Sequence, residues 1–306
     1  MSIKITNGGM LSTIQDAGRT GAQSTGFSVS GVMDCDAYRD ANHLVGNING
    51  EAVIEMTYNG ICAEFLCDTV IAFTGGNFSP TINGLSVPSY HSVSVKRGDI
   101  LKMGMTVDSM RCYMAVKGGF DVPVIMGSRS TNMKIKIGGF EGRKLKTGDI
   151  IPIGHGITEP VRDRFLPKPE YNNEIRVILG PQDKFFTQKG IDTFLSCEYT
   201  VSDKSDRMGY RFDGAEIENN GTDIISDGIA QGSIQISSNG QPIIMMADRQ
   251  TTGGYAKIAT VISVDIPKLA QKKPGEKVKF TAVTLKEAQK EYIKKEKHYR
   301  TLFLED

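Results

Sequence analysis

The chain has 306 residues, which is longer than one typical hydrophobic core requires and predicts two domains of ordinary size. Its 36 Lys and Arg residues are balanced by 35 Asp and Glu residues, and a net charge of +1 provides no general attraction to nucleic acid or to an anionic membrane. Glycine is frequent, at 34 residues, and with short Val and Ile runs it predicts a turn-rich, mainly β protein with a few helices.

The first half of the chain has the pattern of short strands separated by turns. A strand at 3–6 leads into the segment IQDAGR at 14–19, where an acid, a glycine and an arginine follow a β run. Asp34 is placed to cap a helix whose apolar residues recur at helical spacing. These residues are Ala37, Ala41, Leu44 and Val45. Further β segments are predicted at 52–56, 62–66, 70–73, 92–95, 100–103, 111–116, 138–142 and 150–153.

A turn with a basic residue, a glycine and an acid recurs along the chain, at 96–99, 146–149 and 273–276. The recurrence indicates repeated β units, although Gly-acid turns are also common for purely structural reasons. Regular periodicity fails between residues 154 and 174, where Pro160, Pro167 and Pro169 cluster. We place a boundary there and expect one domain over residues 1–160 and a second over residues 161–306.

The second half begins with a strand at 175–179, an amphipathic run near Phe185 and Phe186, and a strand at 199–202. Strands at 232–237 and 242–247 form a predicted hairpin, because the Asn-Gly pair between them tolerates positive φ. A β-branched strand at 258–264 follows. A capping box at 284–287 then starts a helix that presents Leu285, Ala288 and Tyr292 on one face.

The loop DRQTTGGY at 248–255 is the segment best suited to bind a ligand. The fork of donors on Arg249 fits a carboxylate or a phosphate, and the two glycines let the main chain approach a ligand closely. The alternative is a polar loop that satisfies its own backbone groups. Arginines lie among similar residues in three further loops, at 14–19, 127–131 and 205–211.

Several familiar site motifs are missing from the sequence. It contains no phosphate-binding P-loop, no H-E-x-x-H and no G-x-S-x-G, and its four histidines are scattered. Met133-Lys134 is like the pair in biotin-accepting turns but has the wrong neighbours, so no covalent biotin is expected. The five cysteines include no C-x-x-C pair and the first residues hold no apolar signal core, so we expect reduced thiols in a cytoplasmic protein with no membrane span.

A set of motifs, spread in order over about residues 3 to 285, resembles the KipA family. They are IQDAGR at 14–19, SGVMD at 30–34, ANHLVGN at 41–47, GSRST at 127–131, SDRMG at 205–209 and DRQTTGGY at 248–255. Members of this family are described as biotin-dependent carboxyltransferase-like proteins, allophanate hydrolase subunit 2 or the C subunit of bacterial 5-oxoprolinase. The resemblance implies two tandem cyclophilin-like β-barrel domains. It also implies two partners, a KipI-like B subunit plus an A subunit, which work with this chain to convert 5-oxoproline and ATP to glutamate, ADP and phosphate.

This implied chemistry requires donors for developing negative charge and a group that holds the substrate carboxylate. We expect Arg207 and Arg249 to act in catalysis, and we name Asp248 as a candidate general base, although the sequence does not identify that base. The expected substrate-binding residues are Asp16, Arg19, Gln235, Gln250, Thr251, Thr252, Gly253, Gly254 and Tyr255. ATP with Mg²⁺ is expected to be shared with the partner subunits, no metal site is expected on this chain, and the chain alone is expected to be inactive.

Two other functions stay open at this level. One is a regulatory role of the KipA type, in which the chain binds a histidine-kinase inhibitor. The other is a carboxyltransferase-type role in urea or allophanate metabolism. Both share the motifs above, so the sequence does not separate them from a role in 5-oxoprolinase.

Overall fold

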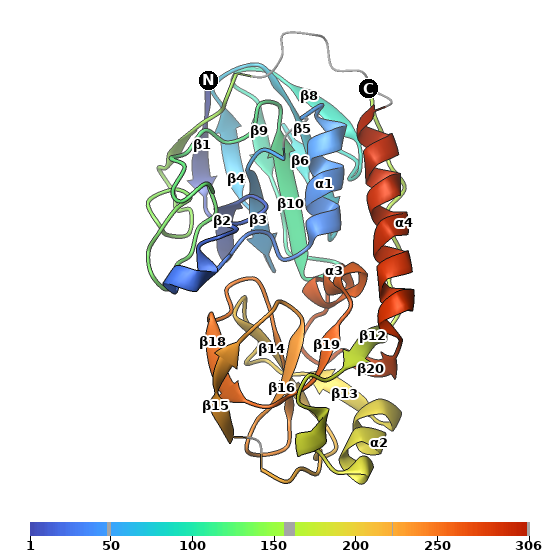
Figure 1. Cartoon of the computed structure of the whole chain (residues 1–306). Coiled ribbons are helices and arrows are strands. Elements are labelled where there is room, and N and C mark those ends of the chain that lie inside the picture. Colours follow the sequence, from blue (N-terminus) through green and yellow to red (C-terminus); the bar gives the residue numbers. More distant parts are fainter. Residues whose placement is uncertain (48–49, 156–162, 222, 305–306) are drawn as a thin grey trace. The chain divides into compact units, whose positions relative to one another are not determined.

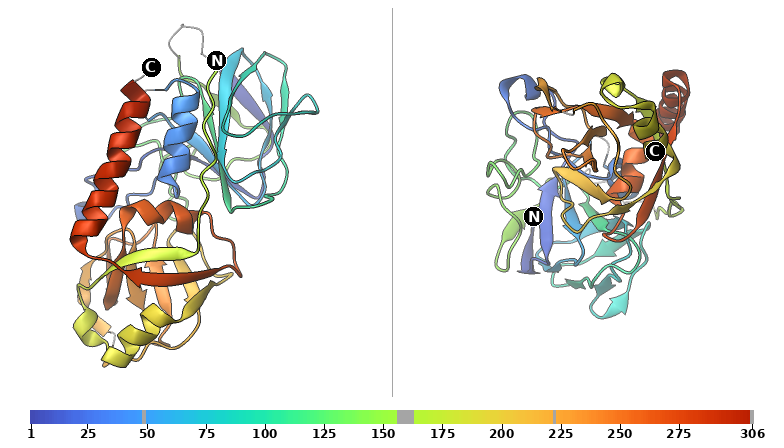
Figure 2. Two further views of the ribbon diagram at one scale, coloured as in Figure 1. Left: turned by 90° about the vertical axis from the view of Figure 1, so that its right-hand side faces the viewer. Right: turned by 90° about the horizontal axis from the view of Figure 1, so that it is seen from below.

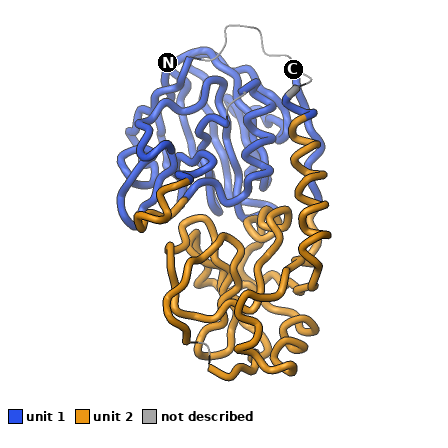
Figure 3. The backbone as a smooth tube through the Cα atoms, in the orientation of Figure 1, with its two compact units in different colours: residues 1–20, 30–170, 301–306 blue, residues 21–29, 171–300 orange. Residues whose placement is uncertain are grey.

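The computed structural model of the protein describes residues 1–47, 50–155, 163–221 and 223–304 (Figure 1). The chain divides into two compact units, which Figure 3 shows in different colours. Unit 1 comprises residues 1–20, 30–170 and 301–306, and unit 2 comprises residues 21–29 and 171–300. The boundary predicted at residues 160/161 lies outside the described residues and stays a prediction.

The strands of unit 1 form two antiparallel sheets. The six-stranded sheet has the order β11-β1-β4-β9-β6-β7, and the five-stranded sheet has the order β2-β3-β10-β5-β8. The bounds of these strands are β1 (Ser2–Asn7), β2 (Leu11–Gln15), β3 (Val53–Thr57), β4 (Cys62–Phe65), β5 (Thr69–Gly75), β6 (Thr81–Ile82), β7 (Leu85–Ser86), β8 (Ser92–Val95), β9 (Ile100–Lys102), β10 (Arg111–Val116) and β11 (Ile150–Pro152).

Both sheets of unit 1 contribute to one apolar core, which contains Ile3 and Phe65 from one sheet and Met114 from the other. The opposite face of the five-stranded sheet is covered by helix α1 (Cys35–Leu44), which packs against Tyr113 and other buried residues (Figure 2). Strand β10 is therefore buried along its whole length, since successive side chains point alternately into the core and toward the helix.

Helix α1 begins as the sequence predicts. One carboxylate oxygen of Asp34 accepts hydrogen bonds from the backbone N–H groups of Asp36 and Ala37, both at 3.0 Å. Two N–H groups that lack a partner within the helix are thus satisfied. The predicted apolar face, including Ala41 and Leu44, is fully buried.

Unit 2 is built on a closed barrel of seven strands in the order β12-β19-β16-β17-β14-β13-β20. Strands β12 and β20 pair in parallel and close the barrel, whereas its other pairs are antiparallel. The bounds of its strands are β12 (Glu174–Leu179), β13 (Glu198–Val201), β14 (Gly209–Asp213), β16 (Ser233–Ile236), β17 (Pro242–Met245), β19 (Lys257–Val261) and β20 (Lys277–Ala282). A separate two-stranded sheet joins β15 (Asp223–Gly228) to β18 (Thr252–Tyr255).

Helices complete unit 2. They are α2 (Gln188–Ser196), α3 (Ile266–Ala270) and α4 (Leu285–Leu304), with short 3₁₀ turns at Gln23–Thr25, Asp183–Phe185 and Ser263–Asp265. Helix α4 belongs to unit 2 as far as Arg300, and its last residues belong to unit 1. Phe194 of α2 stacks on Phe280 of the barrel with ring centres 4.6 Å apart. The prediction of a mainly β fold with a few helices is confirmed.

Three local predictions were wrong or incomplete. Residues 138–142 form no strand, because Gly138, Gly139, Glu141 and Gly142 all have positive φ and a run of that kind cannot continue a ladder. The strand predicted at 258–264 ends at Val261. The second half of the loop predicted at 248–255 is strand β18, which pairs with β15.

Candidate functional site

The side chain of Arg249 is the most unusual charged group in unit 2. It is only 7% exposed, although it lies in a loop, four residues after the end of strand β17 at Met245. Its Nε donates to the backbone carbonyl of Ile229 at 3.1 Å, and its Nη1 donates to the carbonyl of Met246 at 3.2 Å. Two main-chain carbonyls therefore hold the guanidinium in one orientation.

Within the part of the chain that the structure describes, Arg249 has no carboxylate partner and its Nη2 has no hydrogen-bond acceptor. Burial lowers the pKa of Arg249, which is the direction expected when a cation leaves water without a counterion. An isolated buried charge costs several kcal/mol, roughly, and a bound anion would offset much of that cost. The geometry thus favours an anion at the open edge of this guanidinium.

Arg207 and Asp248 are brought together as an ion pair. Arg207 Nε lies 2.8 Å from Oδ2 of Asp248, and Nη2 lies 3.2 Å from Oδ1. The backbone N–H of Asp248 also donates to the carbonyl of Arg207 at 2.8 Å. Both carboxylate oxygens of the predicted general base are therefore engaged by one guanidinium, and the pair fixes the loop immediately before Arg249.

Gln235, Gln250 and Gly253 also lie together. A Cβ atom at Gly253 would stand 3.0 Å from the amide nitrogens of both glutamines and 2.6 Å from a carbon of Ile229. Gly253 is therefore required for close packing at this point. Gln235 is buried and donates to the carbonyl of Tyr255 at 3.1 Å, which fixes its side chain.

The remaining predicted residues of this loop play main-chain roles or face solvent. The carbonyl of Thr251 accepts from the N–H of Ile229 at 3.0 Å. Thr252 and Tyr255 are exposed at either end of β18, and Gly254 is half-buried between them. None of these three brings a side-chain donor into the contacts of Arg249 in the described residues.

A second cation lies close to this group and was not found from the sequence. Lys257, 3% exposed, is opposite Gln235 in the register of β19 and β16. Its ammonium lies 2.8 Å from Asp227, which also accepts from Gln182 at 3.1 Å. The hydrogen bond from Lys257 lowers the pKa of Asp227. No sequence pattern distinguishes a buried lysine in a strand from an exposed one, so the burial of Lys257 could be found only from the structure.

Asp16 and Arg19 lie in unit 1 and act there as anchors for a loop. The carboxylate of Asp16 accepts from the hydroxyls of Ser128 and Ser130 and from the backbone N–H of Arg129. Arg19 is fully buried and donates to the carbonyl of Ser130 at 2.5 Å. These contacts are of the kind that hold a turn in place.

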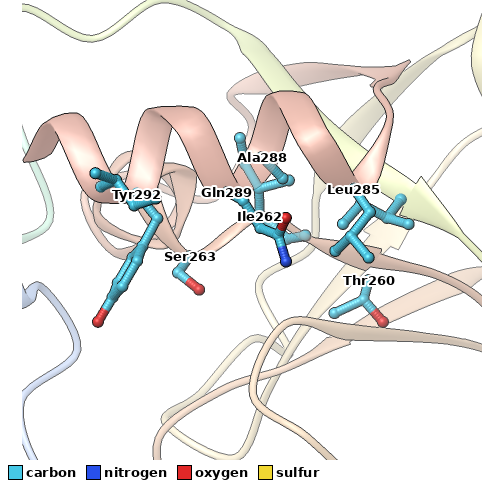
Figure 4. Close-up of a pocket in the computed structure, with 10 residues that line it drawn as sticks. Thr260, Ile262, Ser263, Leu285, Ala288, Gln289 and Tyr292 are labelled. Atoms are coloured by element: carbon cyan, nitrogen blue, oxygen red, sulfur yellow. The ribbon is translucent and has the colours of Figure 1, made fainter.

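Unit 2 also contains an apolar pocket of about 620 Å³ at the start of α4 (Figure 4). The face predicted for this helix, Leu285, Ala288 and Tyr292, lines one wall of it. The other lining residues are Ile178, Thr260, Val261, Ile262, Ser263, Gln289 and Ile293. Since no charged residue lines this pocket, it offers an anionic ligand no countercharge.

Other kinds of site find no support in the described residues. They contain no group of three or more His, Cys, Asp and Glu side chains placed to hold a metal ion. No helix among them is both long enough and apolar enough to cross a membrane. All five cysteines are free thiols.

Comparison with known proteins places this chain in a family. The carboxyltransferase domain, subdomain A and B, matches residues 25–282. A protein named as the C subunit of 5-oxoprolinase, from Escherichia coli (strain K12), is 37% identical over 98% of this chain and 97% of its own length. A second protein of that name, from Haemophilus influenzae (strain ATCC 51907 / DSM 11121 / KW20 / Rd), is 39% identical over 91% of this chain and 90% of its own length.

Among solved structures, urea carboxylase from Kluyveromyces lactis superposes with a TM-score of 0.92 at 29% identity. The match covers 98% of this chain but 29% of that much longer protein.

Proposed function

The chain belongs to the family of the carboxyltransferase domain, subdomain A and B, and from that membership we propose that it works as the C subunit of a 5-oxoprolinase. Such an enzyme hydrolyses 5-oxoproline to glutamate with ATP. The observation that carries the proposal is the end-to-end match with a 5-oxoprolinase C subunit, which this chain covers over 97% of its length. Urea carboxylase, in contrast, is matched over 29% of its length, so a urea-directed role is the second candidate.

In this proposal, Arg249 receives the carboxylate of 5-oxoproline. The buried guanidinium already uses Nε and Nη1 to bond main-chain carbonyls, which leaves the edge at Nη2 for a ligand. The lactam ring itself is uncharged, so the carboxylate is the anionic handle by which the substrate can be oriented. Asp248 keeps Arg207 in place beside this site and both stay proposed catalytic residues.

The buried amide of Gln235 and the cation of Lys257 are suited to stabilise negative charge that develops on the lactam carbonyl oxygen. The amide nitrogen of Gln250, like that of Gln235, lies close to Gly253, and we propose that it also binds the substrate. Thr251, Thr252, Gly254 and Tyr255 complete the proposed binding loop through their main chain. Asp16 and Arg19 stay assigned to binding only as a prediction from the sequence.

ATP activates the lactam oxygen in this reaction, and we propose that it is bound together with Mg²⁺ by the partner subunits. The support is in the sequence, which carries no P-loop. The proposed partners are a KipI-like B subunit plus an A subunit, and the complex works in the cytoplasm without covalent biotin on this chain. A single polypeptide that supplies only part of the active site should be inactive alone.

The test is a reconstitution in which the three proteins are purified singly and in every combination. Glutamate release and ATP hydrolysis are measured with Mg²⁺ and either 5-oxoproline or urea. We expect activity with 5-oxoproline only when all three proteins are present. Full turnover by the 306-residue chain alone contradicts the proposal, activity with urea supports the second candidate, and inactivity of every combination supports the regulatory role.

A further inference from the structure

A short segment from the beginning of the chain lies against the loop that holds Arg249. Residues 21–29 belong to unit 2, whereas their neighbours on both sides belong to unit 1. Within unit 2, Gln23 Nε2 donates to the carbonyl of Ile229 at 3.0 Å and approaches that of Thr251 at 3.5 Å. Ser28 Oγ donates to the carbonyl of Arg249 at 2.8 Å.

Gln23 and Ser28 bond to main-chain carbonyls that also determine where the guanidinium of Arg249 lies. The carbonyl of Ile229 accepts from Arg249 Nε at 3.1 Å and from Gln23 at 3.0 Å, so one oxygen joins both side chains. Ser28 holds the backbone of Arg249 itself. A displacement of residues 21–29 would therefore alter both the position and the direction of the cation.

The residues that flank this segment on either side belong to unit 1 and are bonded to one another or to their neighbours there. The N–H of Val32 donates to the carbonyl of Asp16 at 3.0 Å. Gly31, with φ of +90°, lies so close to Ala17 that a Cβ atom would stand 3.0 Å from its carbonyl. Asn132 donates to Ser30 Oγ at 3.0 Å. Asp16 and Arg19, which precede this segment, are themselves hydrogen-bonded to residues 128–130 of unit 1.

We propose that Gln23 and Ser28 are positioning residues that set the orientation of Arg249. They act on the carbonyls of Ile229, Thr251 and Arg249 and do not touch the substrate. The inference rests on the proposed function only in naming 5-oxoproline as the anion, because the contacts themselves involve no ligand.

The kinetic test uses the reconstituted complex of all three proteins. Ser28→Ala removes one hydrogen bond, and we expect KM for 5-oxoproline to rise about fivefold with kcat unchanged. Ser28→Thr keeps the hydroxyl and should restore the parent KM. Ser24→Ala is the matched control, since Ser24 is exposed in the same segment. A fall in kcat with KM unchanged in Ser28→Ala would indicate a smaller folded fraction and would overturn the proposal.

Coupling to Arg249 is tested by repeating Ser28→Ala and Gln23→Ala in an Arg249→Lys background. If both residues act through Arg249, their effects on KM should largely disappear there, because coupled residues are not additive. Equal effects of each substitution in both backgrounds would show independent roles and contradict the proposal.

A third measurement needs neither substrate nor partner. Arg249-Gln250 is the only Arg-Gln pair in the sequence. Labelling Arg carbonyl carbon with ¹³C and Gln nitrogen with ¹⁵N therefore yields one correlated NMR signal, which reports the Arg249 carbonyl. Ser28→Ala should shift this signal and Ser24→Ala should not. If Ser28→Ala shifts the signal but the reconstituted complex is inactive, the proposed function is contradicted and the positioning role is not. If Ser28→Ala leaves the signal unshifted, the positioning role is contradicted.

Discussion

At the scale of single residues, the decisive feature is that Arg249 is buried without a counterion in the described part of the chain. Arg249→Lys keeps the charge but loses the planar fork that bonds two carbonyls and still presents an edge to a ligand. We expect this variant to lose about 2 kcal/mol of substrate or transition-state binding.

The measurement is kcat/KM for 5-oxoproline in the reconstituted complex. Arg211→Lys is the matched control, because Arg211 is exposed on strand β14 of the same barrel. Unchanged kinetics in Arg249→Lys would return Arg249 to a structural role.

The sequence could predict part of this candidate site, whose function stays a prediction. Arg249, Gln235 and Gly253 carry side-chain or backbone chemistry that is visible in a hairpin and the loop after it. Arg249 and Gly253 both lie against Ile229, and Gln235 lies close to Gly253. Ile229 itself gave no signal, because its contribution is a main-chain carbonyl. Gln23 is 206 residues away from Ile229 in the chain, and no local sequence pattern predicts a contact between residues so far apart.

At the scale of elements, the three turns at 96–99, 146–149 and 273–276 share one conformation. In each, the acidic side chain accepts from the N–H three residues earlier, with distances of 2.8, 2.9 and 2.6 Å. In each, the glycine has a φ near +90°. The recurrence seen in the sequence is therefore a repeated structural unit, and it occurs in both units of the chain.

This turn predicts a conformational cost for losing its glycine. Gly148 has a φ of +94° and no atom within 4 Å of an added Cβ, so Gly148→Ala should destabilise the protein by about 1–2 kcal/mol through backbone strain alone. Gly228→Ala is the matched control, since Gly228 has equal space and no positive φ. Denaturant unfolding measures both variants, and equal stabilities would contradict the prediction.

Elements with strong local patterns were predicted well, and those without were not. The cap and apolar face of α1 and the hairpin of β16 and β17 follow from residue type and spacing. Strand β18 was missed because the sequence Thr-Gly-Gly-Tyr is typical of a loop. It is a strand because it pairs with β15, whose residues lie well before it in the chain. Tertiary pairing of this kind is not encoded locally.

At the scale of the whole molecule, acid stability should depend on Asp265, which is fully buried in unit 2. Burial acts to raise its pKa, but hydrogen bonds from Arg176 at 2.7 to 3.0 Å and the nearby Lys268 outweigh this and lower it. An acid whose pKa is lower in the folded state stabilises that state above its unfolded pKa, about 3.9, and the stabilisation is lost as pH falls below it.

We therefore expect the free energy of unfolding to decline below about pH 4. Asp265→Asn should lower stability at pH 7 by about 3 kcal/mol and flatten this acid decline. Urea unfolding between pH 2.5 and 7 measures both effects, with Asp203→Asn, on an exposed residue, as the control. If the free energy of unfolding of Asp265→Asn falls with pH as steeply as that of the parent protein, other carboxylates cause the acid decline.

The interrupted sequence of unit 2 also has a consequence for synthesis on the ribosome. Ser28 leaves the ribosome long before Arg249, which is 221 residues further along. At roughly 5–20 residues per second, about 10–45 s of translation separate the two. During that interval the segment 21–29 has no barrel to pack against, so the part of unit 2 that is made first is also among the last to reach its final contacts.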